Sequence, residues 1–212
     1  MRGRNKPWAK DYIAANENLI YQKDNIITKP LTLEIGIGKG DFICQNAIAN
    51  LDYQHIGIEV NTSIFAVAMK KIVNNKIENI SLLNIDASKI EEFINPESIE
   101  KLYLNFSDPW PQNGYRKRRL VHPIFLEKFE KLLINNGQIL FKTDNLQLFE
   151  MGVKNFKERN YHFEFLSYDY QTVPGDFVSE YEAKFRLQGM KIYRAVITVD
   201  KSDIKPWIEA NK

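Results

Sequence analysis

Residues 105–120, with the sequence NFSDPWPQNGYRKRRL, place an acid between an apolar segment and a row of cations. Asp108 follows the apolar residues 101–106, which predict a buried strand. Pro109 and Pro111 fix their own backbone angles and restrict the residues before them, so Asp108 has little conformational entropy left to lose. Trp110 offers a flat face on which a base can stack. We interpret Asp108 as a carboxylate held still beside a negatively charged ligand.

Four consecutive cations follow this loop, and they can bind phosphates. A cation run just before a helix is unfavourable for that helix, because the helix dipole is positive at its N-terminus. Such a conflict between local preference and sequence is typical of a functional site. The alternative to phosphate binding is that these cations are only the solvated start of a helix. The four are Arg116, Lys117, Arg118 and Arg119.

A second motif, EIGIGKG, follows the apolar residues 31–35 and contains Glu34, Gly36, Gly38 and Gly40. Glycines let the backbone turn tightly and approach a ligand closely. Glu59 closes the next strand pattern, where a carboxylate can accept both hydroxyls of a ribose. Together these residues predict a site for a cofactor that contains a nucleoside.

The glycine spacing selects among nucleoside cofactors. In the dinucleotide fingerprint GxGxxG the third glycine comes one residue later than Gly40, and Asp41 occupies that place here. Glu34 would also repel a pyrophosphate, which disfavours a nicotinamide-dependent oxidoreductase. An acid at this point suits a cationic ligand with an amino acid portion, such as S-adenosylmethionine. Asp86, after the third strand pattern, can then accept from the adenine amino group, as in the class I methyltransferase pattern.

The elements that position these residues alternate between strand and helix patterns, which predicts a parallel sheet with helices on both faces. Two final strand patterns, with no clear full helix between them, predict an antiparallel hairpin at one edge. The fold class is therefore α/β, doubly wound, with a mostly parallel seven-stranded sheet. The strand patterns are 31–35, 54–60, 79–86, 101–106, 138–143, 163–170 and 190–199, and the helix patterns are 41–50, 61–75, 88–93, 122–134 and 146–159.

In such a sheet the fourth strand lies beside the first, so we expect Asp108 to face the glycine loop. The chain of 212 residues predicts a single domain, with a basic N-terminal extension (1–20) and a C-terminal tail (200–212). The net charge of +2 means that affinity for nucleic acid must come from local clusters. One cysteine excludes a multi-cysteine metal site and fits a reducing cytosol, and no apolar run is long enough to span a membrane, so we expect a cytoplasmic protein with no metal and no membrane contact. We expect a monomer or homodimer.

The DPWP loop, with KRRL after it, resembles the bacterial tRNA (guanine-N7)-methyltransferases. Other segments agree in the same order along the chain: MRGRNKPWA, EIGIGKG, GIE, FKTDN, SEYEAKF and IYRA. The resemblance implies a class I, Rossmann-like methyltransferase that methylates guanine N7 at a variable-loop guanosine of tRNA. It also implies that Asp108 is catalytic and that S-adenosylmethionine is bound by Glu34, Gly36, Gly38, Gly40, Glu59, Asp86 and Asp108.

For the substrate, the resemblance implies a guanosine site and an RNA-binding block. The guanosine site comprises Gln112, Asp144, Ser179, Glu180, Tyr181 and Glu182, and the block comprises Gly114, Tyr115, Arg116, Lys117, Arg118 and Arg119. Three residues depart from the family pattern. Gln112 stands where Lys is usual, Tyr115 where His is usual, and Ser179 where Thr is usual. One local cation is thereby lost and one aromatic ring is added.

Guanine N7 has a lone pair and no proton to lose, so alignment and a nearby carboxylate suffice for its methylation. Two alternatives remain open: another class I methyltransferase acting on an exocyclic amine of DNA or protein, and an inactive RNA-binding relative. The basic N-terminus (Arg2, Arg4 and Lys6, with Trp8) is a candidate contact to the phosphate backbone. Lys142 and Lys184 are candidates for extending a basic face.

Overall fold

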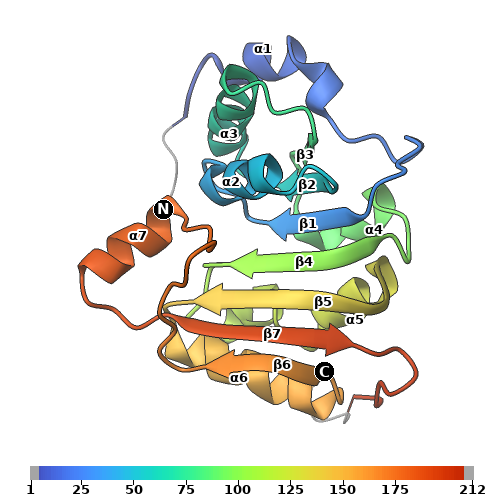
Figure 1. Cartoon of the computed structure of the whole chain (residues 1–212), viewed down its shortest axis with the longest axis vertical. Helices are drawn as coiled ribbons and strands as arrows, with labels where there is room; N and C mark the ends of the chain where they lie inside the picture. The colour runs from blue at the N-terminus through green and yellow to red at the C-terminus, as the bar shows by residue number, and fades with distance from the viewer. Residues whose placement is uncertain (1–4, 208–212) are drawn as a thin grey trace.

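A seven-stranded sheet forms the centre of the computed structural model, which describes residues 5–207 without the side chain of Asn113 (Figure 1). The strand order is β3-β2-β1-β4-β5-β7-β6. Five strands are parallel: β1 (Leu31–Ile35), β2 (Gln54–Ile58), β3 (Ile80–Leu83), β4 (Ile99–Asn105) and β5 (Leu133–Thr143). The antiparallel strand β7 (Tyr193–Val199) lies between β5 and β6 (His162–Ser167). The predicted doubly wound α/β sheet with an antiparallel edge pair is confirmed.

Helices cover the two faces of the sheet (Figure 1). One layer contains α2 (Asp41–Ala49) and α3 (Thr62–Asn74), with α1 (Ala9–Ala14) outside them. The other contains α4 (Ile90–Phe93), α5 (Pro123–Leu132) and α6 (Leu146–Glu158). Asparagine side chains accept from the first-turn amides of α3 and α6, at Asn61 and Asn145. Three 3-10 turns complete the described elements: η1 (Glu17–Leu19), η2 (Ala87–Lys89) and η3 (Asn113–Arg118).

The boundary between α5 and β5 differs from the predicted helix over 122–134 and the predicted strand over 138–143. The helix ends at Leu132 and the strand begins at Leu133, so Gly137 lies within β5, opposite Val199. Leu132 and Leu133 are both buried. Because the apolar run continues from the helix into the sheet, its pattern gave no break to mark the boundary.

A helix that the sequence did not predict, α7 (Glu180–Leu187), connects β6 to β7. It stands apart from both helical layers, beyond the carboxyl ends of β4 and β5 (Figure 1). The only residue of α7 that is buried is Glu182, so the helix lacks the apolar stripe by which a surface helix is recognised. Besides the contact of the half-buried Phe185 with Phe106, the attachments of α7 to the rest of the protein are polar.

The segment before β1 packs on the body of the protein. Ala9 is buried, and the amide of Lys6 donates to Ser63 Oγ at 3.0 Å. Tyr12 and Ile13 of α1 pack against the cluster beneath α2 and α3. Residues 5–20 are therefore folded against α3, whereas the predicted contacts of Arg2 and Arg4 fall outside the described residues.

Trp207 is buried near the other end of the chain and lies 4.9 Å from the Arg159 guanidinium. The predicted C-terminal tail thus folds back as far as this residue, and residues 208–212 fall outside the described part. Within the described residues, none of the helices has the length and apolar composition needed to cross a membrane.

Trp207 rests on a buried ion pair. Arg159 binds Glu130 through two nitrogens, with Nε donating to Oε1 at 2.7 Å. The Tyr161 hydroxyl also donates to this carboxylate, and burial is the main cause that raises the pKa of Tyr161. Removing one partner of a buried pair leaves an uncompensated charge.

We expect Glu130→Ala to lower the free energy of unfolding by about 3–5 kcal/mol, because it strands Arg159 inside the protein. Urea denaturation followed by circular dichroism measures the change. Glu150→Ala, at an exposed position of α6, is the control and should change stability by less than about 0.5 kcal/mol. Equal effects of the two substitutions would contradict this role for Glu130.

Candidate active site

The glycine loop after β1 leaves open space on its outer side. Gly36, Gly38 and Gly40 have φ values of +81°, +55° and +82°, which bulkier residues rarely adopt. A Cβ at Gly36 or Gly38 would meet no heavy atom of the described chain within 4 Å, whereas one at Gly40 would lie 3.2 Å from Ala68 Cβ. Gly40 therefore packs tightly against α3, and the two earlier glycines expose their backbone to a ligand.

Glu59, directly after β2, holds this loop in place. Its carboxylate accepts from the amide of Gly38 at 3.1 Å and from the amide of Asn61 at 2.9 Å. Burial is the main cause that raises the pKa of Glu59, and the charge of Asp108 raises it further. A carboxylate has about four lone-pair sites, so these two amides leave room for the predicted ribose contact.

Glu34, near the end of β1, is buried beside the loop. Its Oε1 accepts from Asn105 Nδ2 at 3.2 Å, and its buried Oε2 has no hydrogen-bond partner in the described chain. Burial raises the pKa of Glu34 to about 8, although Asn105 and Lys142 act in the opposite direction. A ligand with a positive centre or donor groups would satisfy this oxygen, so the site fits the predicted cofactor.

The other two acids are exposed. Asp86 is the N-cap of η2 and accepts from the amide of Ser88 at 2.8 Å, which is the main cause that lowers its pKa. The positive charge of Arg118 also lowers the pKa of Asp86. Asp108 follows β4, which pairs with β1 as expected. Because β1 lies between β2 and β4 in the sheet, the glycine loop and the loop of Asp108 follow neighbouring strands at the same edge.

The loop that carries Asp108 contains two strained residues. Phe106 and Trp110 have φ values of 50° and 42°, which are outliers for bulky side chains. Arg119 stabilises this conformation because its Nη2 and Nε donate to the Trp110 carbonyl at 2.9 and 3.3 Å. Backbone strain of this kind persists only where surrounding contacts fix it, and it is concentrated at functional sites.

The predicted RNA-binding block divides into two parts. Arg118 lies 5.0 Å from the rings of both Trp110 and Tyr115, and Arg119 is bound to the loop, so these cations brace the motif. Arg116 and Lys117 extend from η3 with exposed side chains. Gln112, Gly114 and Tyr115 are also exposed.

The predicted guanosine-binding residues lie mainly at the start of α7. Ser179 caps the helix by accepting from the amide of Glu182 at 3.1 Å. Glu180 is exposed and forms an ion pair with Lys39 of the glycine loop at 2.7 Å, and Tyr181 is exposed as well. Asp144, directly after β5, is half-buried. The remaining residue of the set, Glu182, is buried.

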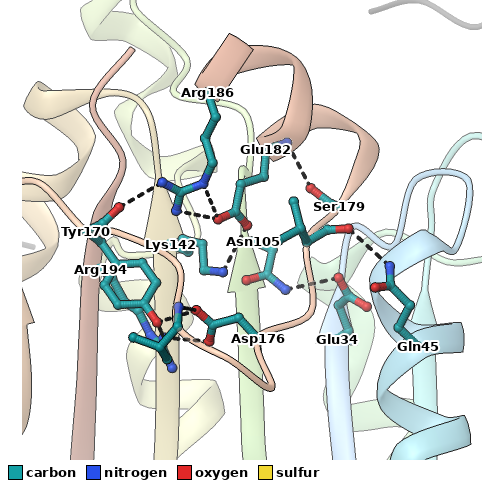
Figure 2. A network of polar contacts seen from close by, with 12 residues as sticks. Glu34, Gln45, Asn105, Lys142, Tyr170, Asp176, Ser179, Glu182, Arg186 and Arg194 are labelled. Atoms are coloured by element: carbon teal, nitrogen blue, oxygen red, sulfur yellow. Dashed lines mark hydrogen bonds and ion pairs between the residues drawn. The ribbon is translucent and has the colours of Figure 1, made fainter. Parts of the chain in front are cut away.

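A polar network beneath α7 was missed from the sequence (Figure 2). Asn105, Lys142 and Arg194 lie side by side on β4, β5 and β7, and Figure 2 shows them facing the segment that leads into α7. Lys142 Nζ binds Glu182 at 2.9 Å and is buried, so the prediction that Lys142 extends an exposed basic face is wrong. A lysine inside an apolar strand was the available signal. The network also includes Tyr170, Asp176 and Arg186.

A cavity of about 150 Å³ adjoins this network. Tyr103, Asn105 and Lys142 line it from the sheet, and Phe42 and Phe177 line it from α2 and the α7 segment. Gln45 of α2 donates to the Val178 carbonyl at 3.0 Å. Residues 175–178, the segment that leads into α7, therefore contact both the sheet and α2, the helix that follows the glycine loop.

Named relatives are similar in sequence to this chain over almost its whole length. A family model described as "Putative methyltransferase" matches residues 28–195. The tRNA (guanine-N(7)-)-methyltransferase of Bacillus subtilis is 38% identical over 93% of this chain and 98% of its own. The enzyme of the same name from Ureaplasma parvum is 40% identical over 91% and 95%. This chain belongs to the tRNA (guanine-N(7)-)-methyltransferase family.

Solved structures at lower identity share the fold. An rRNA methylase from Streptococcus thermophilus superposes with a TM-score of 0.55 at 12% identity, over 95% of this chain and 99% of that one. A SAM-dependent methyltransferase from Aquifex aeolicus gives 0.54 at 11% identity, over 92% and 94%. The Rossmann-like fold predicted for this member of the tRNA (guanine-N(7)-)-methyltransferase family is thus confirmed. No cluster of His, Cys, Asp and Glu suited to a metal occurs among the described residues.

The burial of Glu34 predicts a pH-dependent cost in stability. Its pKa of about 8 in the folded protein exceeds the ordinary value of 4.5, so folding favours the protonated form. The stability that the folded protein gains from this preference is fully present below pH 4.5 and is lost as the pH rises through 8. We expect Glu34→Gln to gain stability relative to the wild type over this interval, by at most about 1.4 kcal/mol per pH unit.

Urea denaturation of cofactor-free protein at pH 5, 7 and 9 measures this gain. Glu150→Gln on the surface of α6 is the control, and its difference from the wild type should not vary with pH. Parallel pH profiles for Glu34→Gln and the wild type would show that Glu34 is ionised at no cost.

Proposed function

We propose that this protein transfers a methyl group from S-adenosylmethionine to N7 of a guanosine in the variable loop of tRNA. The observation that carries the proposal is the gathering of Glu34, Glu59, Asp86 and Asp108 at the carboxyl ends of four adjacent parallel strands. This is where doubly wound sheets bind ligands. The named relatives, at 38% and 40% identity over more than nine tenths of this chain, support the same substrate.

The chain's own groups suit the cofactor. Gly36 and Gly38 let the backbone approach it, and Glu34 offers an unpaired buried oxygen. Glu59 and Asp86 are the carboxylates that we propose for the ribose and the adenine. When bound, S-adenosylmethionine would supply the methyl group of its sulfonium to guanine N7, with S-adenosylhomocysteine as the leaving group. Glu34 then bears its negative charge opposite a cation, which favours its ionised form.

Asp108 is the proposed catalytic residue. N7 carries no proton, so the reaction needs alignment and stabilisation of the positive charge that develops on the base, and no general base. An exposed carboxylate on a loop fixed by Arg119 and two prolines can meet the base without reorganising. Substrate contacts come from Gln112, Asp144 and the first turn of α7, and phosphate contacts come from Arg116 and Lys117.

We expect the purified protein to form 7-methylguanosine when incubated with labelled S-adenosylmethionine and unmodified bulk tRNA. Asp108→Ala should lower the rate by roughly 100-fold or more, because the charge-stabilising group is lost. Nucleoside analysis of digested tRNA identifies the product. Asp52→Ala, at an exposed turn after α2, is the control and should retain the wild-type rate.

Other outcomes have definite meanings. Methylated exocyclic amines of DNA or protein, with no 7-methylguanosine, would support the other class I methyltransferase activity. Cofactor and tRNA binding without transfer would support an inactive RNA-binding relative.

Arg116 and Lys117 should act through phosphates alone. We expect Arg116→Ala and Lys117→Ala each to weaken tRNA binding and to reduce the slope of log K against log salt by about 1. Filter binding between 50 and 200 mM salt measures this slope. Lys154→Ala, on the exposed side of α6, is the matched control, and an equal change there would refute a localised RNA contact.

A further inference from the structure

Glu182 belongs to the segment expected to read the guanine, yet its side chain is 1% exposed. Its Oε2 accepts from Lys142 Nζ at 2.9 Å, and its Oε1 accepts from Arg186 at 2.7 and 3.0 Å. Figure 2 shows this carboxylate between the two cations, under the helix. A base edge could reach it only if the buried ion pair were broken, which leaves Lys142 uncompensated.

The partners of Glu182 come from two different elements. Lys142 is at the end of β5, in the rigid sheet, whereas Arg186 is one turn further along α7. Arg186 also donates to the Tyr170 carbonyl at 2.9 Å. On the neighbouring strand β7, Arg194 binds Asp176 at 3.2 Å. These contacts attach the helix and the segment before it to β5 and β7.

Glu182 also holds the first turn of α7, whose other side chains are exposed. The amide of Glu182 donates to the hydroxyl of Ser179, which caps α7. Glu180 and Tyr181 lie between these two residues and are exposed. Phe185 is the one apolar side chain of α7 that is half-buried, with its ring centroid 6.1 Å from that of Phe106. The buried attachment of Glu182 therefore has the main part in deciding how this first turn is presented.

We propose that Glu182 is a positioning residue: its buried contacts with Lys142 and Arg186 place the first turn of α7 against the substrate, and it does not touch the base. This inference rests on the proposed function for its substrate. It assigns Lys142 a role as the fixed anchor in the sheet. Ser179, Glu180 and Tyr181 remain the residues of this turn that contact guanosine.

The test replaces the ion pair by apolar side chains of similar length. Buried pairs tolerate joint replacement by apolar groups far better than the loss of one partner. Glu182→Met alone should lower kcat/KM for tRNA by roughly 10- to 100-fold, since a small misplacement near the reacting groups has effects of that size. The Lys142→Met/Glu182→Met double variant should regain about tenfold or more over Glu182→Met. Glu91→Met, which removes the two ion pairs of α4 with Lys128 and Lys131 of α5, is the control for pair loss and should match the wild type.

Two further measurements separate positioning from general damage. Glu182→Met should bind S-adenosylhomocysteine within about threefold of the wild type by calorimetry, because none of the residues proposed to hold the cofactor is replaced and the Glu180–Lys39 contact of the glycine loop is exposed. Amide hydrogen exchange in residues 180–187 should accelerate in Glu182→Met and slow again in the double variant. The wild type, measured in parallel, gives the reference for both.

The outcomes are distinct. A double variant in which α7 is protected but activity is not regained would show that Glu182 contacts the base, and would overturn the inference. Unchanged exchange in Glu182→Met would also overturn it, since the ion pair would then not hold the helix. A wild type that forms no 7-methylguanosine would refute the proposed function, while the exchange comparison would still decide whether Glu182 positions α7.

Discussion

The site depends on the electrostatic cost of gathering four carboxylates at one edge of a sheet. The local environment that offsets this cost differs from one acid to the next. Glu34 is protonated more readily than an ordinary glutamate, Glu59 accepts from two backbone amides, and Asp86 caps η2 near Arg118. Asp108 remains exposed. Without a cationic ligand the arrangement is unfavourable, and a bound cation removes much of that cost, so the apo site is already biased toward its cofactor.

The acids could be predicted because a simple rule places them. Parallel strands end at the same edge, and polar residues that follow apolar runs must therefore meet there. The helix α7 could not be predicted in this way, because it buries a carboxylate in place of an apolar stripe. The role of Lys142 was missed for the same reason. Its partner, Glu182, is distant in sequence. The segment FKTD, in which Thr143 separates the lysine from Asp144, does not indicate which carboxylate the lysine binds.

The conformation of the DPWP loop was only partly predictable. Two prolines indicated rigidity, but positive φ values at Phe106 and Trp110 could not be read from residue types that rarely adopt them. The strain is stabilised by contacts from outside the loop. Arg119 binds the Trp110 carbonyl, and the amide of Phe106 donates to the Lys142 carbonyl at 2.8 Å. One cation row thus holds the loop and also contains the residues proposed to contact RNA.

This division explains how the chain can depart from its family at two places in the same motif. Tyr115 lies 5.7 Å from the Trp110 ring and shares Arg118 with it, so the added aromatic residue joins the bracing of the loop. Gln112 is exposed beyond the prolines, where a lost positive charge affects long-range attraction more than local structure. The two departures therefore bear on the proposed RNA contact and on loop rigidity, whereas the four acids and the open glycine loop proposed to hold the cofactor are all present.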